Sequence, residues 1–301
     1  MLRRWILSTL VIFLCIILVA CNNTNTQQPQ AEATSNTNFQ ELSKISAKRV
    51  VTLSSLTTDI ISQLDKTKLV GISGSTLFKN DPRFQDITRV SEGQSPPNLE
   101  KIVSLKPDLV IGAEGFSNQP IQRLQQLGIA TLLTQVNTWS SLEDTTKKIA
   151  QLIDANPQPL LEKYKSFIPE ETKATTSTLV LVSTQPILTP NKNSWAGDLL
   201  EKFPVKNLAA ELQGKSPIAG YVTLSPEKVL AANPEVIILI TPPQGGSKTA
   251  VLDDFKKDGF WQKLQASTNN RVYVFDYYGL VNPGSIDAIK KACEQLKQYL
   301  L

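Results

Sequence analysis

Short apolar segments alternate with longer amphipathic segments along most of this chain. In the first half the apolar runs are short, end at Ser, Gly or Pro, and are separated by segments with apolar residues at helical spacing. Apolar strands alternating with helices are typical of a parallel sheet that is covered on both faces. We therefore predict strands over residues 49–53, 69–72, 108–112 and 129–133, and helices over 57–64, 99–105, 120–127 and 142–153.

The same alternation returns in the second half of the chain. It predicts strands over 178–182, 235–240 and 271–275, helices over 195–203, 227–232 and 286–300, and a further element over 260–264. Between the halves, apolar residues from Leu160 to Ile168 recur at helical spacing and predict one connecting helix. The fold class is thus α/β, with an N-terminal lobe over 45–155, a long connecting helix within 156–176 and a C-terminal lobe over 177–301.

One stretch of sequence occurs twice. Residues 98–111 (NLEKIVSLKPDLVI) align with residues 225–238 (SPEKVLAANPEVII), with four identical positions. In each copy a proline ends a helix, and an acidic residue and a buried strand follow. Glu100 and Glu227 begin the two helices, where a carboxylate stabilises the positive end of the helix dipole. The repeated Glu-Lys pair also fits a second interpretation, in which two lobes present equivalent glutamates to one symmetric partner.

The first forty residues have a different composition. Arg3 and Arg4 precede an uncharged, mostly apolar run over 6–20, which is shorter than the roughly 20 residues of a membrane span and typical of a secretory signal. The run ends in Leu-Val-Ala-Cys21, which resembles a bacterial lipobox, although a short membrane anchor with an incidental cysteine is the alternative. We predict a signal peptide over 1–20 and, over 21–44, a lipidated Cys21 followed by a flexible, Asn/Thr/Gln-rich tether.

The composition excludes several classes of function. The chain contains no histidine, so Ser-His-Asp triads, Cys-His pairs and His-bearing zinc sites are all excluded. The formal net charge of +4 is too small to suggest a nucleic-acid partner. Cys293 lies at helical spacing with Ile286, Ile289 and Leu296, which predicts a buried, unpaired thiol. We predict no catalytic residue and no metal ligand.

The order and spacing of these segments resemble one family, the periplasmic iron-siderophore/vitamin B12 substrate-binding lipoproteins of ABC transporters. The resemblance runs from about residue 48 to 301 and rests on RVVTLS (49–54), LVGI (69–72), PNLE (97–100), LKPDLVI (105–111), GDLL (197–200), GYVTLS (220–225), NPEVI (233–237) and NRVY (270–273). It implies two Rossmann-like lobes joined by one rigid helix, with a ligand clamped in a cleft between them. It also implies that Glu100 and Glu227 dock onto arginines of a permease dimer.

Candidate ligand-binding residues follow from the topology of such sheets. Ligands of open α/β sheets bind outside the carboxyl ends of the strands, where small polar residues and aromatic rings supply contacts. Taken singly, each of these side chains also fits a role in packing. The candidates are Ser54, Ser55, Gly74, Ser75, Phe116, Trp195, Tyr277 and Tyr278, with Lys79, Arg83 and Lys192 as possible partners of an anionic chelate.

These observations predict a lipid-anchored binding protein of the bacterial cell envelope. It would act as a monomer, without a covalently bound cofactor, and deliver a ferric siderophore to an ABC permease; cobalamin or haem is the alternative ligand. An enzyme using Glu114 or Asp276 is a rival hypothesis, but no second carboxylate is evident near either. A ligandless adhesion or sensor lipoprotein is another. Residues 245–249 (GGSKT) lack the glycines of a phosphate loop and predict a surface loop.

Overall fold

The computed structural model describes residues 42–300 apart from 43, 94, 171–175, 215 and 217. From Leu42 onward the chain forms one compact unit. The predicted signal peptide, Cys21 and nearly all of the predicted tether lie outside the described residues. No helix within the described ranges is long and apolar enough to cross a membrane.

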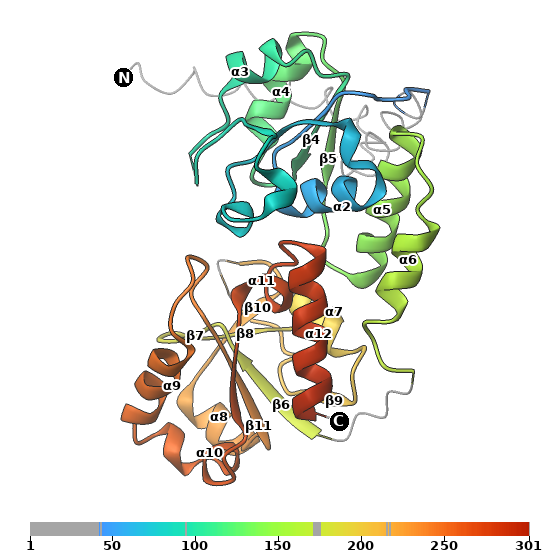
Figure 1. Ribbon diagram of the computed structural model, residues 1–301. Coiled ribbons are helices and arrows are strands. Elements are labelled where there is room, and N and C mark those ends of the chain that lie inside the picture. Colours follow the sequence, from blue (N-terminus) through green and yellow to red (C-terminus); the bar gives the residue numbers. More distant parts are fainter. Residues whose placement is uncertain are drawn as a thin grey trace, which may run out of the picture. The chain divides into compact units, whose positions relative to one another are not determined.

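The first lobe, drawn from blue to green in Figure 1, contains a five-stranded parallel sheet in the order β3-β2-β1-β4-β5. Helices α3 and α4 cover one face, where Ile102, Ile121 and Leu124 pack against Val51 and Val110. The chain order reverses between β1 and β4, which pair in parallel. The elements are β1 (Val50–Thr52), α2 (Ser55–Asp65), β2 (Leu69–Ile72), β3 (Thr88–Arg89), α3 (Leu99–Ser104), β4 (Leu109–Ala113), α4 (Asn118–Gln126), β5 (Thr131–Thr134) and α5 (Trp139–Leu152), with short 3-10 helices at Lys66–Lys68, Thr76–Phe78 and Pro82–Phe84.

The second lobe contains a four-stranded parallel sheet in the order β12-β11-β6-β9 and a three-stranded antiparallel sheet in the order β10-β8-β7. Helices α8 and α9 pack on one face of the parallel sheet through Val229 and Phe255, and α12 runs along its other side (Figure 1). The strands are β6 (Thr176–Leu181), β7 (Ser183–Thr184), β8 (Ile187–Pro190), β9 (Val205–Asn207), β10 (Tyr221–Leu224), β11 (Val236–Ile240) and β12 (Val272–Phe275). The helices are α7 (Trp195–Leu200), α8 (Pro226–Ala232), α9 (Lys248–Lys257), α10 (Gln265–Thr268), α11 (Tyr277–Leu280) and α12 (Ile286–Leu300), with a 3-10 helix at Trp261–Lys263.

The predicted fold class, α/β with two parallel sheets, is confirmed. The connecting helix is shorter than predicted, because α6 (Gln158–Lys165) ends four residues before Pro169 and β6 already begins at Thr176. The predicted surface loop over 245–249 is partly wrong, since Ser247 caps α9 and Lys248 begins that helix. The residue boundaries between lobes and connector stay a prediction.

The internal repeat has the same local structure in both copies. Asn98 caps α3 by accepting from the Lys101 backbone N–H at 2.9 Å, and Ser225 caps α8 by accepting from that of Lys228 at 3.4 Å. Each helix then leads into a turn at a residue with positive φ, Lys106 at 47° and Asn233 at 39°. The two copies therefore share one helix–turn–strand geometry.

The acidic residue after the proline has the same task in each copy. Asp108 Oδ2 accepts hydrogen bonds from the backbone N–H groups of Lys48 and Arg49, at 2.8 and 3.0 Å. Glu235 Oε2 accepts from the backbone N–H of Ser177 at 2.7 Å and from its hydroxyl at 2.9 Å. In both lobes this carboxylate anchors the start of the neighbouring strand, β1 or β6, which gives the repeated Pro-acidic pair a structural reason.

Two aspartates link the lobes in a reciprocal way. Asp59, fully buried on α2, accepts from the backbone N–H of Ile286, the first residue of α12, at 2.8 Å. Asp198 on α7 accepts from the backbone N–H of Trp139, the first residue of α5, at 2.6 Å. Each lobe thus supplies a carboxylate to the free amino end of a helix that belongs to the other part of the chain.

Arg83 reinforces the first of these links. Its guanidinium lies 2.9 Å from Asp59 Oδ1, 2.7 Å from Asp81 Oδ2 and 3.0 Å from Asp287 Oδ2 on α12. Burial raises the pKa of Asp59, while the hydrogen bonds from Arg83 hold the pKa of Asp81 below its ordinary value. Arg83 is therefore committed to three carboxylates at the junction of the lobes.

Candidate functional site

In the first lobe the strand order reverses between β1 and β4, and the loop after β4 carries an exposed aromatic ring. The backbone of this loop is held at both ends, because Ser117 Oγ accepts from the Ala113 N–H and Asn118 Oδ1 from the Gly115 N–H. Phe116 lies between these anchors with 87% of its surface exposed. A phenyl ring held in water on a fixed loop is suited to cover an apolar face of a ligand.

The other first-lobe candidates have local structural partners. Ser54 Oγ caps α2 by accepting from the Thr57 N–H, and Ser75 Oγ accepts from the Leu77 N–H. The Gly74 N–H donates to Ser91 Oγ, and a Cβ at Gly74 would lie 2.1 Å from the Ser91 carbonyl oxygen. Ser55, the first residue of α2, is half-buried beside them. The glycine is thus required by close backbone packing, whatever else it contacts.

The loop after β2, which the strand-end rule selects, also holds the hydroxyl of Ser73. Ser73 Oγ is buried and has no hydrogen-bond partner among the described residues. Buried polar atoms without a partner are uncommon in folded proteins. Its position directly after a predicted strand was the available signal.

In the second lobe, Tyr277 and Tyr278 follow β12. Their rings meet edge to face with centroids 5.3 Å apart, and the Tyr277 N–H donates to Thr241 Oγ1 after β11. Both side chains are half-buried, and burial raises the pKa of each phenol, so the hydroxyls stay protonated and able to donate. Gly284 packs directly against the ring of Tyr278.

Trp195 does not lie at an accessible surface. Only 3% of its surface is exposed, its indole N–H donates to the Gly279 carbonyl at 2.8 Å, and its ring stacks on Trp139 at 6.1 Å. The prediction of a ligand contact is corrected, because the indole is buried where α7 meets α5. Through its hydrogen bond to Gly279 it supports the segment that carries Tyr277 and Tyr278.

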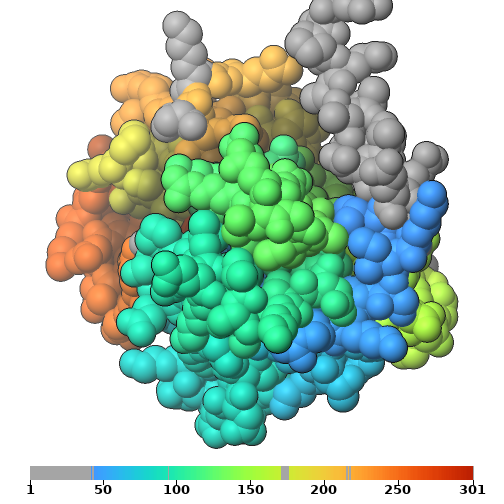
Figure 2. Space-filling view, turned by 90° about the horizontal axis from the view of Figure 1, so that it is seen from above, coloured from blue at the N-terminus to red at the C-terminus, as the bar shows by residue number. Residues whose placement is uncertain are grey.

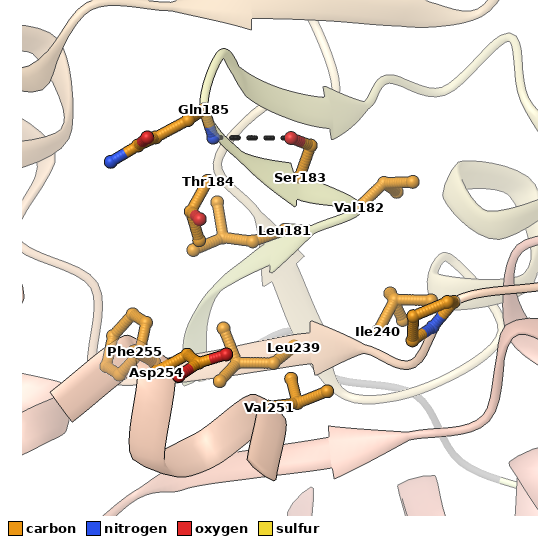
Figure 3. Close-up of a pocket in the computed structure, with 11 residues that line it drawn as sticks. Leu181, Val182, Ser183, Thr184, Gln185, Leu239, Ile240, Val251, Asp254 and Phe255 are labelled. Carbon is orange, nitrogen blue, oxygen red and sulfur yellow. Dashed lines mark hydrogen bonds between the residues drawn. The ribbon is translucent and has the colours of Figure 1, made fainter. Parts of the chain in front are cut away.

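A hollow of about 400 Å³ lies at the carboxyl ends of β6 and β11, where the strand order of the second sheet reverses (Figure 3). The β7–β8 turn forms one wall and α9 the other, and Gln185 donates its backbone N–H to Ser183 Oγ in that turn. The candidate set omitted residues 183–185, although they follow a predicted strand by the same rule. The lining residues are Leu181, Val182, Ser183, Thr184, Gln185, Leu239, Ile240, Pro242, Val251, Asp254 and Phe255.

Most charged side chains near these loops are paired. Lys192 Nζ lies 2.7 Å from Glu211 Oε2, and Asp276 contacts Lys291 at 2.7 Å and Lys248 at 3.3 Å. Burial disfavours the charged form of Asp276, but the two ammonium groups outweigh it and hold its pKa below the ordinary value. Asp276 is therefore a stable anion in an ion-pair cluster, which is unsuited to the acid–base role of the rival enzyme hypothesis.

Glu100 and Glu227 are exposed in the first turns of α3 and α8. The pKa of Glu227 is held below its ordinary value by hydrogen bonds from its own backbone N–H and from Ser225. In the view onto the first lobe, the teal-to-green residues of the α3–α4 region form the exposed face (Figure 2). Both glutamates are therefore exposed and accessible to a partner.

A fold of two parallel sheets, with aromatic rings and small polar groups at the strand ends, is that of a two-lobed ligand-binding protein. Residues 50–278 match the periplasmic binding protein family, and the chain belongs to that family. It is a substrate-binding protein, as the sequence predicts, and members of this class bind and release their ligands rather than convert them.

Three known proteins illustrate the similarity. An uncharacterised ABC transporter substrate-binding lipoprotein of Bacillus subtilis is 29% identical over 76% of this chain and 73% of its own length. The vitamin B12-binding protein of Salmonella typhimurium is 28% identical over 84% of this chain and 91% of its own. The crystal structure of a possible iron-binding (periplasmic solute-binding) protein of Staphylococcus epidermidis has a TM-score of 0.69 at 24% identity, covering 84% and 97% of the two chains, and it shares the fold.

Proposed function

We propose that this protein captures a ferric siderophore between its two lobes and delivers it to the permease of an ABC importer. The observation that carries the proposal is the supply of aromatic rings at the strand ends of both sheets, with Phe116 in one lobe and the Tyr277–Tyr278 pair in the other. Rings of this kind bind the organic shell of a chelate by burying apolar surface. An iron-uptake system-binding protein and a vitamin B12-binding protein are both similar to this chain.

The charges favour a chelate whose surface carries little net charge. Two of the three cations predicted as partners of an anionic ligand are already engaged, Arg83 with three carboxylates and Lys192 with Glu211. Lys79 is exposed on its own loop. A neutral ferric trihydroxamate fits this environment better than a ferric citrate, whose carboxylates would need unpaired cations.

Delivery requires a tether and a docking surface. We propose that Cys21 is lipidated after removal of residues 1–20, and that the following polar segment holds a monomeric binding protein at the membrane of the cell envelope. We further propose that Glu100 and Glu227, one in each repeat copy, contact arginines of the two halves of a permease dimer.

Ligand capture is tested by titrating tryptophan fluorescence with a ferric trihydroxamate, ferric citrate, cobalamin and hemin. We expect quenching at micromolar ferric trihydroxamate, since Trp195 lies directly beneath the loop of Tyr277 and Tyr278. Quenching by cobalamin or hemin alone would replace the siderophore assignment. A protein that none of these probes quenches is not a binding protein for metal chelates.

Docking is tested separately with Glu100→Gln and Glu227→Gln in vesicles that contain the cognate permease. We expect the double variant to bind ferric trihydroxamate normally and to lose uptake. Glu201→Gln is the matched control, because Glu201 is also exposed but lies at the end of α7, outside both repeat copies. Unchanged uptake by the double variant would contradict the docking role.

A further inference from the structure

We propose that each docking surface also contains an exposed aliphatic anchor, Val103 on α3 and Leu230 on α8. This inference rests on the proposed function, because it specifies how the permease recognises the two lobes. Val103 is 42% exposed and Leu230 is 39% exposed. The partner is the permease dimer, and its two equivalent halves would each offer a basic group for the glutamate and an apolar depression beside it.

The two anchors occupy the same position of the internal repeat. With residue 98 aligned to 225, Val103 aligns with Leu230, and the preceding residues Ile102 and Val229 are both fully buried. The two helices are therefore in the same rotational phase. Three residues earlier on each helix stands the glutamate, Glu100 or Glu227, which places it on the same helical face as the anchor.

Neither residue lies in the buried core of its lobe, because both side chains are more than one third exposed. Val lowers helix propensity relative to Lys, Glu or Ala, whereas Leu is a strong helix former, so propensity gives no reason for Val103. The helices are held by their caps and by the buried residues Ile102 and Val229. The remaining exposed large apolar side chains lie outside both repeat copies; among the described residues these are Phe116, Leu127, Leu133, Leu212 and Ile218.

A single exposed aliphatic residue is ordinary, but a pair related by an internal repeat is not explained by chance exposure. A partner that contacts both lobes at once must present two similar surfaces, as a symmetric dimer does. Interfaces commonly combine a buried apolar contact with charged groups at its rim, and the charged groups orient the encounter. Glu100 with Val103, and Glu227 with Leu230, supply this combination once in each lobe.

The test uses Val103→Ser, Leu230→Ser and the double variant, with Leu127→Ser as the matched control. Leu127 is more exposed, at 62%, but lies at the end of α4 and outside the repeat. We expect each single variant to lower uptake of ferric trihydroxamate in permease vesicles several-fold, and the double variant by about tenfold or more. The fluorescence titration and the thermal midpoint should match those of the unmodified protein.

Two outcomes would overturn the inference. In the first, Val103→Ser with Leu230→Ser takes up ligand within twofold of the Leu127→Ser control, while Glu100→Gln with Glu227→Gln abolishes uptake. This result would leave the proposed function intact and show that Val103 and Leu230 are not anchors. A fall in ligand affinity that accounts for the lost uptake would assign Val103 and Leu230 to ligand binding instead. If the glutamate variants also transport normally, the docking proposal itself has failed.

Discussion

The two lobes are alike in the helix–turn–strand unit of the repeat and different almost everywhere else. In both, a capped short helix, a left-handed turn and a proline lead to a carboxylate that anchors the first strand of the lobe. The sheets around this unit differ, with five parallel strands in one lobe and four, plus an antiparallel sheet, in the other. The similarity includes both the exposed glutamates that we propose as permease contacts and the buried strand that follows each helix.

The lobes also expose their aromatic residues differently. Phe116 projects into solvent from a loop whose backbone is held by the side chains of Ser117 and Asn118, whereas the second lobe packs Tyr278 against Gly284 and supports the segment with Trp195. We therefore expect the Phe116 ring to contribute little to folding stability, whereas the Tyr278 ring contributes to the packing of the second lobe. Four sets of variants compare the two lobes.

Truncation of Trp195 should have the largest effect. Trp195→Ala removes a buried indole, its stack on Trp139 and its hydrogen bond to Gly279, and we expect it to lower the free energy of unfolding by about 3–5 kcal/mol. Phe116→Ala should change that free energy by no more than about 0.5 kcal/mol, because the ring is exposed. Urea unfolding followed by circular dichroism measures both. Equal losses would contradict the contrast between the lobes.

Cys293 gives the second lobe a titratable group in its core. Burial raises the pKa of this thiol to about 12 from an unfolded value of 9.0. Because the folded pKa is the higher one, the stability that the thiol contributes is complete below pH 9.0 and is lost as the pH rises toward 12. The slope should approach about 1.4 kcal/mol per pH unit within that window. Cys293→Ala should lack this component of the pH profile, and identical profiles would contradict it.

Ligand affinity and thermal stability together should distinguish the role of Phe116 from that of Tyr278. We expect Phe116→Ala to weaken ferric trihydroxamate binding about tenfold while the thermal midpoint stays constant. Tyr278→Ala should lower both affinity and thermal midpoint, because Gly284 packs on its ring. Tyr278→Phe keeps the packing and isolates the hydroxyl. If Phe116→Ala binds normally while Tyr278→Phe does not, recognition lies in the second lobe alone.

The smallest effects concern the turn of the repeat. Lys106 has φ at 47°, a conformation that costs a side-chain-bearing residue energy, so Lys106→Gly should stabilise the protein by about 0.5–1 kcal/mol. Asn233→Gly should not stabilise it, because Asn tolerates this conformation and Asn233 Oδ1 accepts from the Gln265 N–H at 2.9 Å. Thermal melts of the two variants compare the copies directly. Stabilisation by both would show that the hydrogen bond at Asn233 contributes little.

The sequence predicted the central parallel strands, because a short apolar run bounded by turn residues is typical of a buried strand, but it did not predict the short edge strands β3 and β9. Residues 69–72 match β2, and 235–240 contain β11. The antiparallel sheet was not predicted, since β7 consists of only Ser183 and Thr184 and exists through its pairing with β8. Local pattern carries no information about such a short polar strand.

The site was predicted in part. The rule that ligands bind at strand ends selected the segments of Phe116 and Tyr277, but it ranked Trp195 beside them because burial between two helices is invisible in sequence. Arg83 was a candidate ligand partner because it lies near such a loop, and its actual partners are equally invisible in the sequence. Its contacts with Asp59 and Asp287 join residues far apart in the chain, and no local pattern announces them.

The bond from Asp59 to the first residue of α12 spans 227 positions of the chain. The last helix therefore lacks its full amino-terminal cap until the earliest part of the body has folded. We expect the two lobes to unfold in one cooperative transition, so that heat or denaturant removes both halves of the binding site together.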